Sequence, residues 1–318
     1  MKTILKSLII PKLIILTTLF TTTISADAQG TRLMTQPAIS DSHIAFIYAE
    51  DLWVANKDGS NPKRLTIDEG VESSPVFSPV GTPIAFNAHY GGNTDVYIVP
   101  VSGGIPTRLT WHPYPDLIRD FSPDGSEVLF ASQRNTHTGR HFQLFTISNK
   151  GGTVNQLKVP NAFWASYSGD GSHLAYTPIY DAFYQWKHYR GGTISRIWIY
   201  NTRSHKIEEI SKPAGGCNDS NPQWAGDYVY FISDRNGEFN LFSYKVSSKE
   251  ISQLTNFKDF SIVSLSKSNK DIIFEQAGYL HVHNIASGLT KKLDINIKTD
   301  LLELRPRYVS GDNYIRSG

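Results

Sequence analysis

The chain has 318 residues, with 31 lysines and arginines against 29 aspartates and glutamates. Three of the lysines and one aspartate lie in residues 1–28, so the remainder carries no net charge. A nucleic-acid-binding protein normally has an excess of basic residues, and we therefore exclude that class. The single cysteine, Cys217, excludes an internal disulfide. A chain of this length buries enough apolar surface to fold without one.

The first residues have the pattern of a secretory signal peptide. Lysines at positions 2, 6 and 12 flank and precede an apolar run, Leu13–Phe20, and residues 26–28 (Ala-Asp-Ala) supply a small-x-small cleavage site. A membrane anchor is the alternative, but a bilayer span needs about 20 apolar residues. We therefore expect residues 1–28 to be a cleaved signal. The mature chain, beginning at Gln29, is expected to be secreted, to the periplasm, with no membrane span.

A short apolar triplet that ends in an aromatic residue recurs along the chain. The copies end at Phe46, Phe86, Phe130, Tyr176, Phe231 and Phe274. Successive copies are 40 to 55 residues apart, which is close to the period of propeller blades.

Each triplet has the same kind of neighbours. A tight turn precedes it, as in residues 121–125 (Phe-Ser-Pro-Asp-Gly), and a second alternating strand follows, as in Asp95–Ile98. A last short strand ends the unit, as in Arg108–Thr110. The unit is thus four short strands joined by turns. One such sheet cannot cover its own two faces, whereas sheets arranged radially cover one another.

The sequence therefore predicts an all-β fold, a six-bladed β-propeller of four-stranded antiparallel blades over residues 29–295, followed by a connector or tail at 296–318. The blades are expected at about 36–66, 73–110, 116–160, 163–211, 219–255 and 260–295. A β-sandwich is the alternative, but it would not repeat one unit in this way. We expect no strand shared across the seam, so that side-chain packing between the first and last blades closes the ring.

The usual active-site motifs are not found in the sequence. It has no G-x-S-x-G, H-E-x-x-H, Walker or G-x-G-x-x-G pattern, and we assign no catalytic residue, no metal and no cofactor. His281 and His283 would share one face of a strand, but no third ligand can be assigned, and ordinary strand histidines are the preferred interpretation. Cys217 has no nearby histidine and is interpreted as an inert thiol.

An insertion at residues 177–195 lengthens the fourth unit between its second and third strands. The insertion is rich in aromatic and cationic side chains, which favour contacts with peptides or carboxylates. The candidate substrate-binding or partner-binding residues are Trp186, Lys187, His188, Tyr189 and Arg190. A long hairpin that packs over the blade rim is the alternative interpretation.

The repeated unit resembles the WD-like repeats of TolB and of tricorn-type proteases. Residues 186–193 with 196–200 are similar to the W-x-x-Y-x-G-G … I-W-I segment of the tricorn N-terminal propeller. Residues 221–237 resemble the next blade of that family, and residues 304–309 resemble its connector into a second propeller. The resemblance covers about residues 36–310 and identifies the S41-like serine peptidases as the related family.

This resemblance implies a role in proteolysis without catalysis by this chain. Tricorn-family proteins also carry a second propeller, a PDZ-like module and a serine-protease core, and their catalytic residues match no position here. The implied function is a propeller that gates or channels peptide or unfolded polypeptide, with those further domains as partners and homo-oligomers in the full-length family. The alternatives are a TolB-like periplasmic scaffold for a protein partner, or a propeller glycoside hydrolase with paired carboxylates.

The signal peptide gives the first testable prediction. Export of the full chain should remove residues 1–28, because the charged start, apolar run and small-residue site match what a signal peptidase requires. Mass spectrometry of the exported protein should find Gln29 at its amino terminus. An exported protein that retains Met1 would contradict the prediction.

Overall fold

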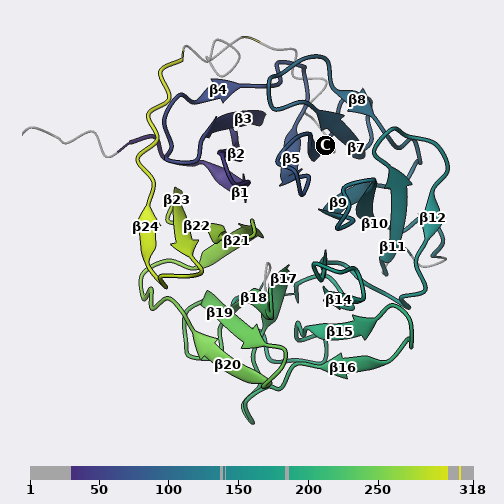
Figure 1. Cartoon of the computed structure of the whole chain (residues 1–318), viewed down its shortest axis with the longest axis vertical. Coiled ribbons are helices and arrows are strands. Elements are labelled where there is room, and N and C mark those ends of the chain that lie inside the picture. Colours follow the sequence, from purple (N-terminus) through teal and green to yellow (C-terminus); the bar gives the residue numbers. More distant parts are fainter. Residues whose placement is uncertain (1–29, 137–138, 140, 183–185, 300–307, 309–318) are drawn as a thin grey trace, which may run out of the picture.

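The computed structural model describes residues 30–136, 139, 141–182, 186–299 and 308. These residues form six four-stranded sheets around a central axis (Figure 1). The predicted fold class, a six-bladed propeller, is confirmed. The expected signal segment, and residues 300–307 and 309–318 of the expected connector, lie outside the described residues. Among the residues that are described, no helix is long and apolar enough to cross a bilayer.

The strands of the first three sheets are β1 (Thr35–Ile39), β2 (His43–Tyr48), β3 (Asp51–Asn56) and β4 (Lys63–Arg64); β5 (Glu72–Phe77), β6 (Ile84–Ala88), β7 (Asp95–Val99) and β8 (Thr107–Arg108); and β9 (Asp116–Phe121), β10 (Glu127–Ser132), β11 (Gln143–Ser148) and β12 (Asn155–Gln156). The strands of the last three are β13 (Ala165–Tyr167), β14 (His173–Tyr176), β15 (Trp198–Asn201) and β16 (Ile207–Glu209); β17 (Asp219–Ala225), β18 (Tyr228–Ser233), β19 (Asn240–Lys245) and β20 (Glu250–Gln253); and β21 (Ile262–Lys267), β22 (Asp271–Gln276), β23 (Tyr279–Asn284) and β24 (Thr290–Lys292).

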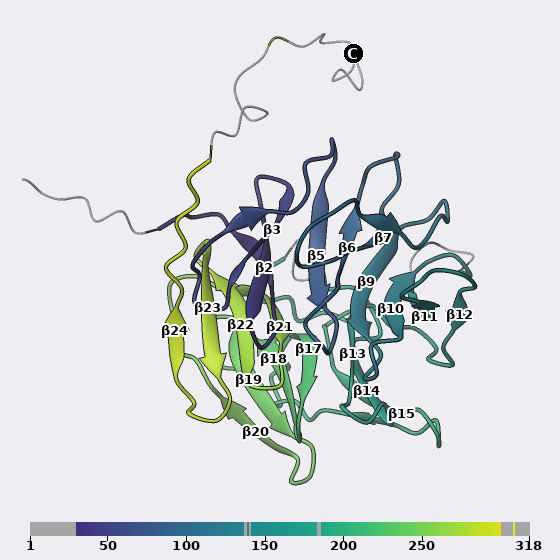
Figure 2. The same ribbon diagram turned by 45° about the horizontal axis from the view of Figure 1, so that its top comes forward.

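Within each sheet the strands keep their order along the chain, and neighbouring strands are antiparallel. The first strand of each sheet (β1, β5, β9, β13, β17 and β21) lies nearest the axis (Figure 1). A tilted view shows these strands running along the axis from one face of the ring toward the other (Figure 2). The innermost strands therefore form the wall of the central space of the ring.

The repeated aromatic residues hold the sheets against one another. Each lies on the second strand of its sheet and is fully buried: Phe46, Phe86, Phe130, Tyr176, Phe231 and Phe274. Phe130, for example, packs with Ala85 and Val96 of the preceding sheet. A ring at this position fills the wedge between two sheets, which is why the sequence repeats it.

Side-chain contacts attach the short outermost strands to the neighbouring strands of their sheets. Arg108 of β8 forms an ion pair with Asp95 at the start of β7, with 2.6 Å between nitrogen and oxygen. Two residues later, the Thr110 hydroxyl accepts a hydrogen bond from a backbone amide of β7 at 3.0 Å. The first sheet repeats the ion pair between Arg64 and Asp51 at 2.9 Å. Because a two-residue strand makes few backbone hydrogen bonds, these contacts explain why Arg-Leu-Thr recurs in the sequence.

Among the described residues, no strand is shared across the seam between the sixth and first sheets, since each sheet contains only consecutive strands. Its core instead joins Phe46 and Trp53 of the first sheet to Ile273 and Leu280 of the last. The segment before β1 adds backbone hydrogen bonds, from Thr31 N to the Ile295 oxygen at 2.7 Å and from Leu33 N to the Gly278 oxygen at 2.9 Å. Closure therefore combines side-chain packing with a short extended segment along the last sheet.

Truncation of one repeated aromatic ring tests this packing. Phe130→Ala should lower the free energy of unfolding by about 3–5 kcal/mol, because it leaves a cavity between two sheets. Lys150→Ala, at an exposed position in a turn of the same blade, is the matched control and should change it by less than about 0.5 kcal/mol. Urea denaturation followed by tryptophan fluorescence measures both values. A similar loss of unfolding free energy in the two variants would contradict the role of the Phe130 ring between the sheets.

Glu72, at the start of β5, gives a prediction about pH. The residue is buried, and burial raises the pKa of its carboxyl from 4.5 to about 7, although the Thr66 hydroxyl donates to it at 2.9 Å. The folded state therefore holds a proton that the unfolded chain releases, and the free energy of unfolding falls as pH rises from 4.5 to about 7. Glu72→Gln should remove this loss, so the variant gains stability over the unchanged chain in that interval. Denaturation curves of both proteins at several pH values measure the effect. A difference in unfolding free energy that stays constant over this pH interval would contradict the prediction.

Candidate functional site

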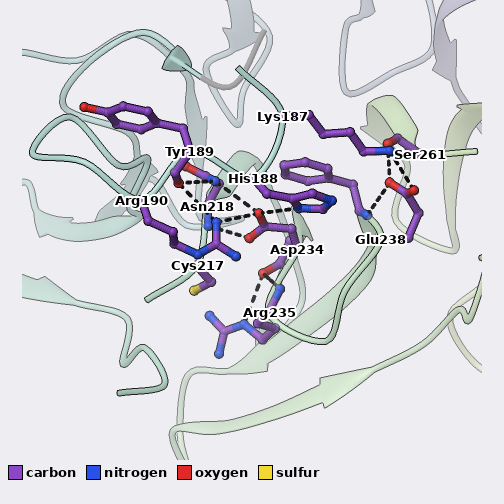
Figure 3. Close-up of polar contacts among 12 residues, drawn as sticks. Lys187, His188, Tyr189, Arg190, Cys217, Asn218, Asp234, Arg235, Glu238 and Ser261 are labelled. Carbon is purple, nitrogen blue, oxygen red and sulfur yellow. Dashed lines mark hydrogen bonds and ion pairs between the residues drawn. The ribbon is translucent and has the colours of Figure 1, made fainter. Parts of the chain in front are cut away.

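The insertion that carries the predicted site residues is anchored to the fifth sheet by Asp234, which follows β18 (Figure 3). The Arg190 guanidinium lies 2.7 Å from Asp234 Oδ2, and His188 Nδ1 lies 3.1 Å from the same oxygen. Asn218 donates two further hydrogen bonds to this carboxylate, from its backbone N at 2.7 Å and from its side-chain Nδ2 at 3.1 Å. A carboxylate buried in this way needs such donors, so Arg190 and His188 have a structural task.

A second ion pair holds the insertion further out. Lys187 Nζ lies 2.7 Å from Glu238 Oε2. Burial acts to raise the pKa of Glu238, but hydrogen bonds from Lys187 and Ser261 outweigh it, and the pKa is lowered. Three of the predicted site residues therefore contact acidic groups of the chain itself.

The two aromatic candidates lie together on the outside of the insertion. The Trp186 and Tyr189 ring centroids are 6.2 Å apart, and the Trp186 side chain is 62% exposed. The His188 ring stacks on Phe239 with centroids 5.7 Å apart. The insertion thus brings the five candidate residues together beside the fifth sheet, and Trp186 is the most exposed apolar side chain among the described residues of the insertion.

The base of the insertion is fixed by a buried carboxyl that the sequence did not single out. Asp181 accepts hydrogen bonds from Trp164 Nε1 at 2.7 Å, the Ser195 hydroxyl at 2.8 Å and the Ser220 hydroxyl at 2.6 Å. Burial raises the pKa of Asp181, and these three donors act against that change. Because Trp164 also faces the axis, the insertion is coupled to the centre of the ring.

A cavity of about 400 Å³ lies on the axis, between the innermost strands. We call it the axial cavity. Its size is within the range of sites for small molecules and short peptides. Its polar lining residues are Thr35, Gln36, Ser74, Arg119, Asn221, Gln223, Ser264, Ser266 and Glu275. Neither the sequence motifs nor the blade pattern marks these positions, because they come from different blades.

Backbone bulges shape the wall of the axial cavity. Gln36, Ser74 and Asn221 have φ angles of 50°, 52° and 49°, which non-glycine residues rarely adopt. Each lies where the register of its innermost strand shifts, and each precedes a proline. Such strained residues cluster at functional sites. The recurring Xaa-Pro pair at the start of an innermost strand was the signal in the sequence that could have located this wall.

Lys267 crosses the axis below the axial cavity. From β21 of the sixth sheet, its ammonium reaches Asp120 Oδ2 on β9 at 3.0 Å and the Ser166 hydroxyl on β13 at 2.6 Å. The third and fourth sheets are not neighbours of the sixth in the ring, so this side chain spans the central space. A second hollow of about 480 Å³, lined by Lys267 and Asp120, lies on the far side. The Lys267–Asp120 ion pair therefore divides the axial space.

The two strand histidines and the single cysteine that the sequence analysis considered are packed in the interior of the blades. His281 and His283 are both buried, and His281 stacks on Phe274 with centroids 5.3 Å apart. Burial raises the pKa of Cys217 to about 12, so its thiol is a weak nucleophile at neutral pH. Within the described parts of the chain, no three His, Cys, Asp or Glu side chains gather as a metal site would require.

Comparison with known proteins places this geometry in a family. The model of the "Tricorn protease N-terminal beta propeller domain" matches residues 31–289. A tricorn protease homolog of Saccharolobus solfataricus is 26% identical over 285 residues, which are 88% of this chain and 26% of that protein. The tricorn protease of Thermoplasma acidophilum is 24% identical over 274 residues, 83% of this chain and 25% of that protein. The chain thus spans about a quarter of the length of these relatives, which have sequence beyond the matched region.

Solved structures agree on the fold. The crystal structure of the tricorn protease superposes with a TM-score of 0.76 at 22% identity, over 85% of this chain and 27% of that one. TolB from Acinetobacter baumannii superposes with a TM-score of 0.63 at 17% identity, over 79% of this chain and 63% of that one. Because the family model covers most of the chain, including all of the strands that line the axial cavity, the chain belongs to the family of tricorn protease N-terminal β-propeller domains.

Proposed function

We propose that this chain is the non-catalytic propeller of a tricorn-like serine peptidase, outside the cytoplasm, and that it gates or channels peptides along its axis. The observation that carries the proposal is the axial cavity, with the Lys267–Asp120 ion pair across the axis beyond it, in a member of this family. Hydrolysis is assigned to other parts of such a peptidase and not to this chain.

The lining of the axial cavity suits a peptide main chain. Each peptide unit has one hydrogen-bond donor and one acceptor. The side-chain amides of Gln36, Asn221 and Gln223 offer both kinds of group, and Val263 and Leu265 add apolar surface. A wall of this kind accommodates many peptide sequences, because it addresses groups that all peptides share.

Lys267 supports the gating part of the proposal. A peptide that passes the whole axis must displace its ammonium from Asp120 and Ser166. Asp120 retains hydrogen bonds from the Ser166 hydroxyl and the Tyr167 amide, each at 3.0 Å, when the lysine moves. The lysine can therefore leave without stripping the carboxylate of all its donors, as a movable barrier requires.

The alternative is a scaffold that binds a protein partner at the insertion. Trp186 is the side chain on which that function would depend, because an exposed tryptophan is a typical anchor of an interface. Variants of the axial cavity and of the insertion therefore distinguish the two functions.

A peptide-retention experiment tests the proposal. The purified chain is mixed with a tryptic peptide digest and recovered by size exclusion, and the bound peptides are quantified by mass spectrometry. Val263→Trp places a bulky side chain at a half-exposed position in the axial cavity and should lower retention about tenfold, a loss of about 1.4 kcal/mol. Ile105→Trp, at a 92% exposed position away from the cavity, is the matched control and should retain peptides as before.

Two results would contradict the proposal. Retention that survives Val263→Trp but is lost in Trp186→Ala would favour the scaffold function. New peptide termini that disappear when a serine of this chain is substituted would mean that the chain is itself catalytic.

A further inference from the structure

Glu275 of β22 presents a carboxyl group to the axial cavity. Its Oε2 accepts a hydrogen bond from the backbone N of Gln36 and another from the Ser264 hydroxyl, each at 3.1 Å. These donors come from the neighbouring first sheet and from β21 of its own sheet. The carboxyl is therefore held in one orientation by two rigid strands and not by a mobile loop.

No cation compensates this carboxyl within the described residues. No lysine, arginine or histidine there forms an ion pair with Glu275, and only neutral groups oppose the effect of burial, which raises its pKa. Asp120 and Asp219, on the innermost strands β9 and β17, differ, because Asp120 has Lys267 at 3.0 Å and Asp219 has Arg235 at 2.6 Å. A desolvated carboxylate without a counter-charge is costly, and such a group in a cavity favours a cationic ligand.

The positive group of the axial cavity lies on its opposite side. Arg119 is on β9 of the third sheet, across the ring from the sixth, and its guanidinium lies over the Phe163 and Trp164 rings at 4.5 and 4.4 Å. Its Nη1 donates to the Ile118 oxygen at 3.1 Å. Arg119 is thus occupied by its own sheet and its neighbour, and the cavity has a negative side at Glu275.

The hydrogen bonds that fix Glu275 continue around the wall. The Gln36 backbone N–H donates to Glu275, and the Gln36 side-chain Oε1 accepts a hydrogen bond from the Ser74 backbone N at 2.6 Å. The bulges at Gln36 and Ser74 therefore serve to orient the carboxyl, which gives a reason for their strained backbone. A preorganised acceptor of this kind loses little entropy when a ligand binds.

We propose that Glu275 binds the alkylammonium group of a peptide, either its amino terminus or a lysine side chain, within the axial cavity. This inference rests on the proposed function, since it names the peptide group that the axial cavity selects. An ammonium has three donors and no acceptor, which matches the carboxylate of Glu275. The charge-assisted hydrogen bond it forms is stronger than the neutral ones that the rest of the wall offers.

Isothermal titration calorimetry of the purified chain with three short peptides tests the inference. Trialanine amide has a free amino terminus, N-acetyl-Ala-Lys-Ala amide has only a lysine ammonium, and N-acetyl-trialanine amide has no charge. We expect at least one cationic peptide to bind about tenfold more tightly than the neutral one, a difference of about 1.4 kcal/mol. Which of the two gains affinity identifies the source of the ammonium.

Two variants separate the charge of Glu275 from the shape of the cavity. Glu275→Gln keeps the size of the side chain and should reduce every peptide to the affinity of the neutral one. Glu250→Gln, on the outermost strand β20, is the matched control and should leave the preference intact. A thermal melt should find Glu275→Gln at least as stable as the unchanged chain at neutral pH, because the substitution removes an uncompensated buried charge.

The outcomes distinguish this inference from the proposed function. Equal affinity for all three peptides, or an unchanged preference in Glu275→Gln, overturns the role of Glu275 and leaves peptide binding in place. Absence of binding by every peptide at concentrations up to about 10 mM, a level at which weak ligands saturate, overturns both.

Discussion

The structure depends on one constraint: each four-stranded sheet has two apolar faces and can bury them only against its neighbours. The aromatic ring on the second strand of each sheet meets this constraint, and Phe46 does so across the seam with Ile273 and Leu280. The same constraint keeps the innermost strands at a fixed distance from the axis. The space they surround is therefore set by the packing of the blades, and its lining can vary without loss of the fold.

The fold was predictable from the sequence because its determinants are local and repeated. The triplets ending in Phe86 and Phe130 and the turns before them recur in every unit, so their period predicts the blades. The axial cavity was not predictable in this way. Glu275, Gln36 and Arg119 are far apart in the sequence, and only the closure of the ring brings them to one cavity. The Xaa-Pro pairs marked some of the wall, but they did not indicate which way a side chain faces.

The insertion illustrates the opposite case. Its composition singled out Lys187, His188 and Arg190 as candidate binding residues, and the structure pairs all three with Glu238 or Asp234. Cationic groups that are expected to bind a carboxylate do so here, but the carboxylates belong to the chain itself. Sequence reasoning identified the chemistry of these side chains and could not identify their partner, because Asp234 and Glu238 belong to the next blade. The Trp186 side chain is 62% exposed and lies beside the Tyr189 ring.

The account as a whole places peptide contact on the axis, between Glu275 and the Lys267–Asp120 ion pair. The most direct measurement is a crystal structure of the chain soaked with Ala-Lys-Ala amide, which has both an amino-terminal and a lysine ammonium. The account predicts density for the peptide in the axial cavity, with one of these two ammonium groups against Glu275. Density for the peptide on the insertion beside Trp186, with the axial cavity free of it, would contradict the account.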